Sequence, residues 1–134
     1  MPLVIKVAAI SSAATMLSEA GEGNTSERAA AVVAFETALA EGHWTRVKQR
    51  DRDLTYNKMS TAELAQMAPS VNWDMMLKAL GLGGQNTVVV REKSAVENAA
   101  KVFANTSVDV LKDYLTVSLM NSHASYLPAG IDNA

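Results

Sequence analysis

The chain has no cysteine among its 134 residues. This absence excludes disulfide scaffolds, thiolate zinc sites and cysteine nucleophiles. Histidine is also scarce, because His43 and His123 are the only two and neither belongs to a His-Glu-x-x-His motif. Aromatic residues make up only 5% of the sequence, so a core would consist mainly of alanine, valine, leucine and the seven methionines. That composition favours packed helices over an aromatic-rich β-sandwich.

Charge of one sign and long apolar runs are missing as well. The formal net charge is −2, which argues against nucleic acid as a partner, since nucleic-acid-binding proteins usually carry a basic patch. No apolar run approaches the roughly 20 residues that span a bilayer, so no membrane span is expected. Residues 1–20 fit a signal peptide poorly and are expected to be helical or irregular. The sequence leaves the compartment open.

The length suits one domain over residues 1–134, and a domain of this size buries roughly 68–70% of its unfolded surface. We predict a mainly α, bundle-like fold. A long helix is expected after a cap at Asn24 or Thr25, because apolar residues recur at helical spacing as far as Val47. Gly42 is the weak point of this helix. The expected buried positions are Val32, Val33, Phe35, Leu39, Ala40, Trp44 and Val47.

Capping residues, proline and glycine divide the middle of the chain into short segments. Residues 49–58 are polar and are expected to form a loop, and Ser60 with Glu63 has capping-box spacing at the start of a short helix that Pro69 ends. Residues 70–80 should form another helix, with Gly81 past its end.

One β-branched run, Thr87 to Val90, is strand-like. A lone strand leaves its backbone groups unpaired, and its partner could be residues 3–7, the same strand of a second molecule, or a segment absent from this chain. Two further capping-box spacings, Ser94 with Glu97 and Thr106 with Asp109, precede apolar-periodic segments. In the last segment, four apolar residues lie on one face: Val108, Leu111, Leu115 and Leu119.

The order of several short motifs resembles the N-terminal helical region of neprilysin-type zinc endopeptidases. The densest block is residues 51–73, DRDLTYNKMSTAELAQMAPSVNW. Each motif alone is weak, but their succession over residues 16–127 is specific, whereas residues 1–15 agree less well. The motifs are Ala34-Phe35-Glu36, Arg50-Asp51, Tyr56-Asn57-Lys58-Met59, Ala68-Pro69-Ser70, Trp73, Val88-Val89-Val90 and Leu111-Lys112-Asp113-Tyr114-Leu115.

The resemblance implies a non-catalytic part of a much longer enzyme. In such enzymes the helical N-terminal part looks like a cap over a cavity that admits short peptides, while the zinc ligands lie in the C-terminal part. The implied partner is therefore the missing catalytic domain of the same polypeptide, with zinc held there and not by this chain. The alternative is an independent helical interaction module that self-associates as a homo-oligomer through the edge of Thr87 to Val90 or the methionine-bearing helices.

No catalytic, cofactor-binding or metal-binding residue is predicted in this chain. Glu36 and His43 are two helical turns apart, about 10 Å along an axis, too far for two ligands near 2 Å from one zinc ion. His43 is expected at a core or helix-end position, and His123 as a capping or solvated residue. His123 with Asp113 or Asp132 and a serine makes no recognisable triad, since no serine lies in a Gly-x-Ser-x-Gly elbow.

Other candidate features have plain structural interpretations. Residues 81–84, with three glycines, lack the Lys-Ser/Thr of a phosphate loop and are expected to stop a helix and turn. The basic cluster Arg46, Lys48, Arg50 and Arg52, interleaved with Asp51 and Asp53, is expected to be a solvated loop with local ion pairs. Tyr56 and Met59 are expected to be buried beside a turn at Asn57. Trp44 and Trp73 are expected to anchor the core or to contact the missing part.

Overall fold

A computed structural model describes residues 3–127 and 129–132. The fold is mainly α with one two-stranded sheet, as predicted. Two compact units divide the chain: the first contains Met1–Ala38 and Thr106–Ala134, and the second contains Leu39–Asn105. None of the helices in the described ranges is long and apolar enough to cross a bilayer.

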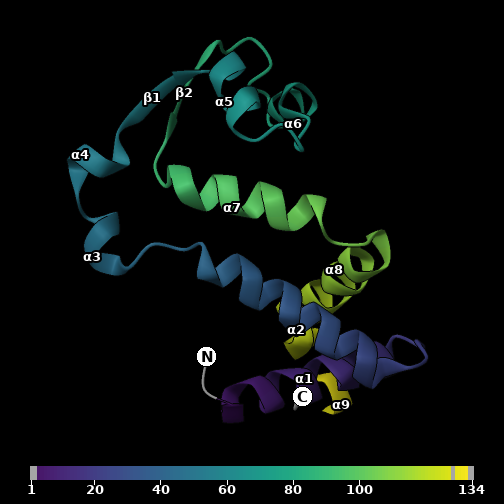
Figure 1. Cartoon of the computed structure of the whole chain (residues 1–134). Coiled ribbons are helices and arrows are strands. Elements are labelled where there is room, and N and C mark those ends of the chain that lie inside the picture. The colour runs from purple at the N-terminus through teal and green to yellow at the C-terminus, as the bar shows by residue number, and fades with distance from the viewer. Residues whose placement is uncertain (1–2, 128, 133–134) are drawn as a thin grey trace. The chain divides into compact units, whose positions relative to one another are not determined.

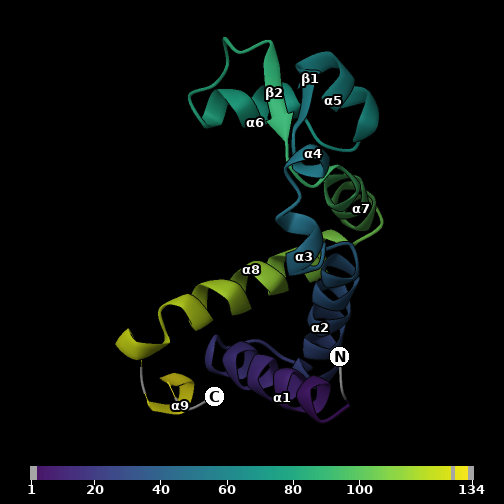
Figure 2. The same cartoon turned by 90° about the vertical axis from the view of Figure 1, so that its left-hand side faces the viewer.

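The first unit is built from α1 (Leu3–Glu19), most of α2 (Thr25–Glu41), α8 (Val108–Ser122), a 3-10 turn (Ala124–Tyr126) and α9 (Ala129–Asp132). α1 packs against α8 and α9, which Figure 2 shows beside it. Ala13, Leu17 and Ala29 form a small buried cluster, and Ile10, Ala14 and Val117 pack around it. Small side chains let these helices approach closely, so alanine builds much of this core.

The second unit contains the end of α2, then α3 (Arg46–Gln49), α4 (Arg52–Thr55), β1 (Asn57–Ser60), α5 (Thr61–Met67), α6 (Trp73–Ala79), β2 (Thr87–Val90) and α7 (Lys93–Ala104). β1 and β2 pair antiparallel, with Asn57 opposite Val90 and Ser60 opposite Thr87 (Figure 1). The predicted strand is confirmed. Its partner, β1, is none of the three that the sequence suggested, because residues 49–58 were expected to form a loop.

The alternative partner, residues 3–7, lies in α1. Its β-branched side chains favour strands only weakly, and helical packing overrides that preference. Asn57 explains why a polar segment can pair with β2. Its side-chain amide donates to the carbonyls of Leu54 (2.7 Å) and Val90 (3.0 Å), which ties the start of β1 to the end of β2.

The helix expected to reach Val47 ends at Glu41, so that prediction of the helix end was wrong. Val32, Val33 and Phe35 are buried as predicted, whereas Val47 lies in α3 and is 82% exposed. Gly42 follows the helix where α7 approaches closely, because a Cβ built on Gly42 would lie 2.8 Å from Cβ of Asn98. Close approach between segments therefore explains the glycine at this point.

Most other helix ends follow the predicted signals. Ser60 and Glu63 form the capping box of α5, and α5 ends just before Pro69. Gly81 has φ +74°, and the amide of Leu82 donates to the carbonyl of Leu77, which completes a Schellman motif after α6. Two predicted caps were wrong. α7 begins after Glu92 and not at Ser94, and α8 is capped one residue later than expected, by Ser107.

Candidate functional site

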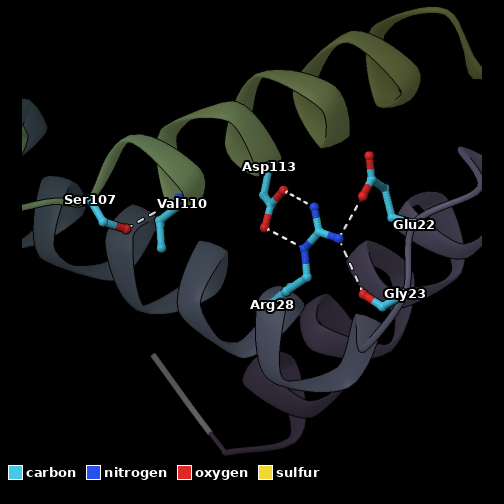
Figure 3. A network of polar contacts seen from close by, with 6 residues as sticks. All are labelled: Glu22, Gly23, Arg28, Ser107, Val110 and Asp113. Carbon is cyan, nitrogen blue, oxygen red and sulfur yellow. Dashed lines mark hydrogen bonds and ion pairs between the residues drawn. The ribbon is translucent and has the colours of Figure 1, made fainter.

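Arg28 connects three segments of the first unit through its guanidinium group (Figure 3). Its Nε and Nη2 donate to the two carboxylate oxygens of Asp113 on α8, at 2.8 Å and 2.5 Å. Its Nη1 donates to Glu22 (2.6 Å) and to the carbonyl of Gly23 (3.2 Å), both between α1 and α2. We call Arg28, Asp113, Glu22 and Gly23 the Arg28 clamp. It joins α2, α8 and the α1–α2 turn.

Local structure places each member of the clamp. α1 ends in a Schellman motif at Gly21 (φ +82°), where the amide of Glu22 donates to the carbonyl of Leu17 at 3.0 Å. This turn brings Glu22 and Gly23 back toward Arg28, which lies in the first turn of α2. On α8, Asp113 is the only charged residue that is buried in the described chain, with 5% of its surface exposed.

The hydrogen bonds of the clamp favour the charged forms of Arg28 and Asp113. Hydrogen bonds from Arg28 lower the pKa of Asp113, although burial acts in the opposite direction. Hydrogen bonds to Asp113 and then to Glu22 raise the pKa of Arg28. A carboxylate held ionised in a bidentate pair is a poor general base, and this guanidinium already has acceptors on both edges. The clamp therefore fixes helices rather than performs chemistry.

A cleft of about 600 Å³ opens beside the clamp. Its charged lining consists of Glu22, Glu27, Asp109 and Asp113 against Arg28 and Lys112. Acids outnumber bases, so the cleft would repel an anionic ligand.

The candidate zinc pair Glu36 and His43 has no site in the structure. Glu36 is exposed on α2 in the first unit. His43 was expected on the buried helix, but it lies beyond the end of α2 in the second unit, is exposed, and its backbone amide donates to Ala40 at 3.1 Å. It is a helix-end residue, one of the two predicted roles.

His123 lies at the C-terminal end of α8, as predicted. Its Nδ1 lies 2.9 Å from the carbonyl oxygen of Leu119 and 3.0 Å from Oγ of Ser122, so the ring caps the helix. Asp113 belongs to the Arg28 clamp and is not part of a triad. The side chain of Asp132 lies outside the described residues. Within the described ranges, no group of three or more histidine, aspartate or glutamate side chains is arranged to hold a metal ion.

The basic cluster lies on the short helices α3 and α4 and between them. Arg46, Lys48, Arg50 and Arg52 are all exposed, and Nζ of Lys48 lies 3.9 Å from the centre of the Trp44 ring. Asp51 caps α4 by accepting from the amides of Asp53 and Leu54. The cluster is therefore a solvated surface, and its polar groups contact neighbouring residues of the same short helices.

The two tryptophans are half-buried and hydrogen-bonded. Nε1 of Trp44 donates to Oγ of Ser94 (2.7 Å), and its backbone amide donates to Glu92 (3.3 Å). Nε1 of Trp73 donates to the carbonyl of Ala68 at 2.9 Å. Both side chains therefore fasten segments within the second unit.

The motifs quoted in the sequence contact one another in pairs. Phe35 meets the edge of Tyr114, with ring centroids 5.0 Å apart, and the Asn57-Lys58-Met59 run pairs with the three valines of β2. Met59 is half-buried, whereas Tyr56 is 66% exposed, so its predicted burial was wrong. These residues thus carry structural contacts within each unit.

No role for Arg28 was predicted from the sequence, and Asp113 was named only as part of a family motif and as a rejected triad member. One signal was present: Asp113 lies between Val110 and Val117 at helical spacing, where a charge on an apolar row requires a partner. Nothing in the sequence indicates that the partner lies 85 residues earlier.

Comparisons with known proteins agree over nearly the whole chain. The model of peptidase family M13 matches residues 5–134. Endothelin-converting enzyme 1 of Mus musculus is 29% identical over 107 residues, which cover 77% of this chain and 14% of that enzyme. The Homo sapiens enzyme has the same identity and coverage. The chain therefore spans about one seventh of the length of these relatives.

Two solved structures of the Mycobacterium tuberculosis zinc metalloprotease Zmp1 have the same fold. Its open state, determined by cryo-electron microscopy, has a TM-score of 0.86 and 27% identity, covering 98% of this chain and 21% of that chain. Its crystal structure in complex with an inhibitor has a TM-score of 0.85, also with 27% identity.

Proposed function

The chain belongs to peptidase family M13, and we propose that it is a non-catalytic N-terminal part of a zinc metallopeptidase, inactive alone. The resemblance to neprilysin-type enzymes in residues 51–73 is confirmed by the family match over residues 5–134. The observation that carries the proposal is coverage: 98% of this chain corresponds to 21% of one related protease chain, and 77% of it corresponds to 14% of a curated relative. We also propose that residues 1–134 form a single domain of that enzyme.

The donor set of this chain does not fit a catalytic zinc ion. Catalytic zinc sites generally use three protein ligands, most often histidine and carboxylate, and leave one position open. Here the two histidines belong to different units, and within the described ranges no three histidine, aspartate or glutamate side chains are grouped to hold a metal ion. We therefore place the zinc ligands in the remainder of the enzyme, where cleavage of short peptides would occur.

The role of this chain within that enzyme would be to build part of the wall that limits which peptides enter. Two contacts within the first unit support such a role, because the Arg28 clamp and the aromatic Phe35–Tyr114 contact hold α2 and α8 together. A helical wall must be rigid to exclude large substrates.

Self-association is a second candidate function, and one observation favours it. Large apolar side chains are exposed in both units, including Leu115 and Leu119 in the first and Met75 and Leu80 in the second. Exposed apolar patches beyond a few hundred Å² commonly mark protein interfaces. Light scattering of the purified chain measures this directly, since a dimer doubles the mass and a monomer rejects this second candidate.

The test of the main proposal is a peptidase assay on the purified chain with metal analysis of the same sample. We expect no cleavage of short fluorogenic peptides above buffer, with or without added zinc, and less than stoichiometric zinc after dialysis. His43→Ala and His123→Ala serve as matched variants. Stoichiometric zinc together with cleavage that either substitution abolishes would overturn the proposal.

A further inference from the structure

The outward side of α8 carries a row of large apolar residues. Val108, Leu111, Leu115 and Leu119 recur at intervals of three and four residues, so they share one face over about 16 Å of helix. Val108 and Leu115 are each 64% exposed and Leu119 is 62% exposed, while Leu111 is half-buried. We call these four residues the α8 stripe.

The rest of α8 is already committed to the first unit. Val117 packs on the α1 core, Tyr114 meets Phe35, and Asp113 is held by Arg28. α8 therefore has two apolar faces and one of them is exposed. A helix with apolar residues on most sides is ordinarily buried on most sides.

We propose that the α8 stripe is the docking surface for the zinc-bearing remainder of an M13 peptidase. This inference rests on the proposed function and adds where the two parts meet. The comparison with Zmp1 indicates this partner, because the shared fold covers 98% of this chain but only 21% of the Zmp1 chain. About four fifths of that protein therefore lies outside the shared fold and has to pack against some of its surface.

The positive charge of Lys112, beside the α8 stripe, indicates which charge the partner surface should carry. Lys112 is exposed and lies one turn from both Val108 and Leu115 on the same side of the helix. The matching surface should be apolar, with a carboxylate opposite Lys112. A second copy of this chain fits less well. Two-fold pairing of the stripe would bring both Lys112 side chains near the symmetry axis, where like charges repel.

The experiment uses Mycobacterium tuberculosis Zmp1 produced without the segment aligned to this chain, as an immobilised probe in a binding assay. The full chain is the analyte, compared with Leu115→Gln/Leu119→Gln. Glutamine keeps helix propensity close to that of leucine, so circular dichroism and thermal unfolding should be unchanged. The matched control is Ile5→Gln/Val7→Gln, which alters two exposed apolar residues on α1 in the same unit.

We expect the stripe variant to bind at least roughly tenfold more weakly than the wild type, because central apolar anchors dominate interfaces. The α1 control should bind within about twofold of wild type, and Lys112→Glu should weaken binding most at low salt. Lys112→Glu also keeps the proposal testable if the glutamine variant unfolds.

Equal binding by wild type and stripe variant would overturn this inference and leave the proposed function standing. Equal weakening by the α1 control would also overturn it. If the wild type does not bind the probe although circular dichroism shows that the probe is folded, the docking proposal falls, while the family match over residues 5–134 stands. If light scattering finds a wild-type dimer that the stripe variant abolishes, and the probe is not bound, the occupant is a second copy.

Discussion

The substitution Asp113→Asn tests whether the Arg28 clamp holds α8 in the first unit. It removes the charge of the buried carboxylate and one of its two acceptors, while Arg28 keeps Glu22 at 2.6 Å. Breaking a fully buried ion pair costs about 3–5 kcal/mol. Here the Arg28 side chain is 31% exposed and retains its second partner. We therefore expect a loss of about 1–3 kcal/mol in the free energy of unfolding, the range for a buried hydrogen-bonding group that loses its partner.

The measurement is urea unfolding followed by circular dichroism, together with amide hydrogen exchange resolved by segment. Exchange in α8 should accelerate roughly 5- to 150-fold, while β2, which lies in the other unit, should be unaffected. Asp109→Asn is the matched control, because Asp109 is an exposed acid one turn earlier that lines the same cleft. It should lose only about 0.5 kcal/mol, from its position in the first turn of α8.

The pH dependence of the stability difference between wild type and Asp113→Asn tests the role of the Asp113 charge most directly. Arg28 lowers the pKa of Asp113 in the folded chain, so the unfolded state binds the proton more tightly than the folded state does. The stabilisation is fully present above the unfolded pKa of about 3.9 and is lost as pH falls through the lower folded value. The stability difference between wild type and Asp113→Asn should be constant from about pH 7 to pH 5 and shrink below about pH 4. A difference that grows on acidification, or is no larger than that of Asp109→Asn, would refute the reasoning.

Three further substitutions test local features by thermal or urea unfolding. Gly42→Ala should destabilise by about 1–3 kcal/mol because its Cβ would meet Asn98, whereas helix propensity alone predicts a gain of about 1 kcal/mol, so the sign decides between them. Ser60→Ala should lose about 1 kcal/mol with the α5 capping box, and an unchanged midpoint would show that the box is unimportant. Gly81→Ala should lose about 1–2 kcal/mol because φ is +74°. Gly84→Ala, which meets nothing within 4 Å, should stay within about 0.5 kcal/mol, and equal losses at both glycines would contradict the left-handed-cap explanation.

The features predicted well are those whose cause lies within a few residues. The capping box of Ser60 and Glu63 and the stop at Gly81 depend only on side chains and backbone angles of one helix end. The strand Thr87–Val90 was found at its observed bounds because four consecutive residues favour the extended backbone. Family membership was also readable, since it rests on the order of motifs along the chain.

The predictions that failed depended on a distant segment. α2 stops at Glu41, and Gly42 just beyond it lies against Asn98 of α7, 56 positions later; apolar periodicity carries no information about that contact. Asn57 begins a strand because β2 pairs with it and its amide reaches Val90. Propensity assigned the same residues to a loop, since asparagine and lysine are poor strand formers.

By itself, the sequence determined the helix start at Ser60, the helix stop at Gly81, the strand Thr87–Val90, the mainly helical composition and the membership in family M13, because these follow from short-range patterns and their order. Only the tertiary structure decided which side chains meet. The pairing of Arg28 with Asp113 joins residues 85 positions apart, and the exposure of Leu115 and Leu119 depends on which face of α8 meets α1. Periodicity defines the faces of a helix, but the choice between them is made by the segments that pack against it.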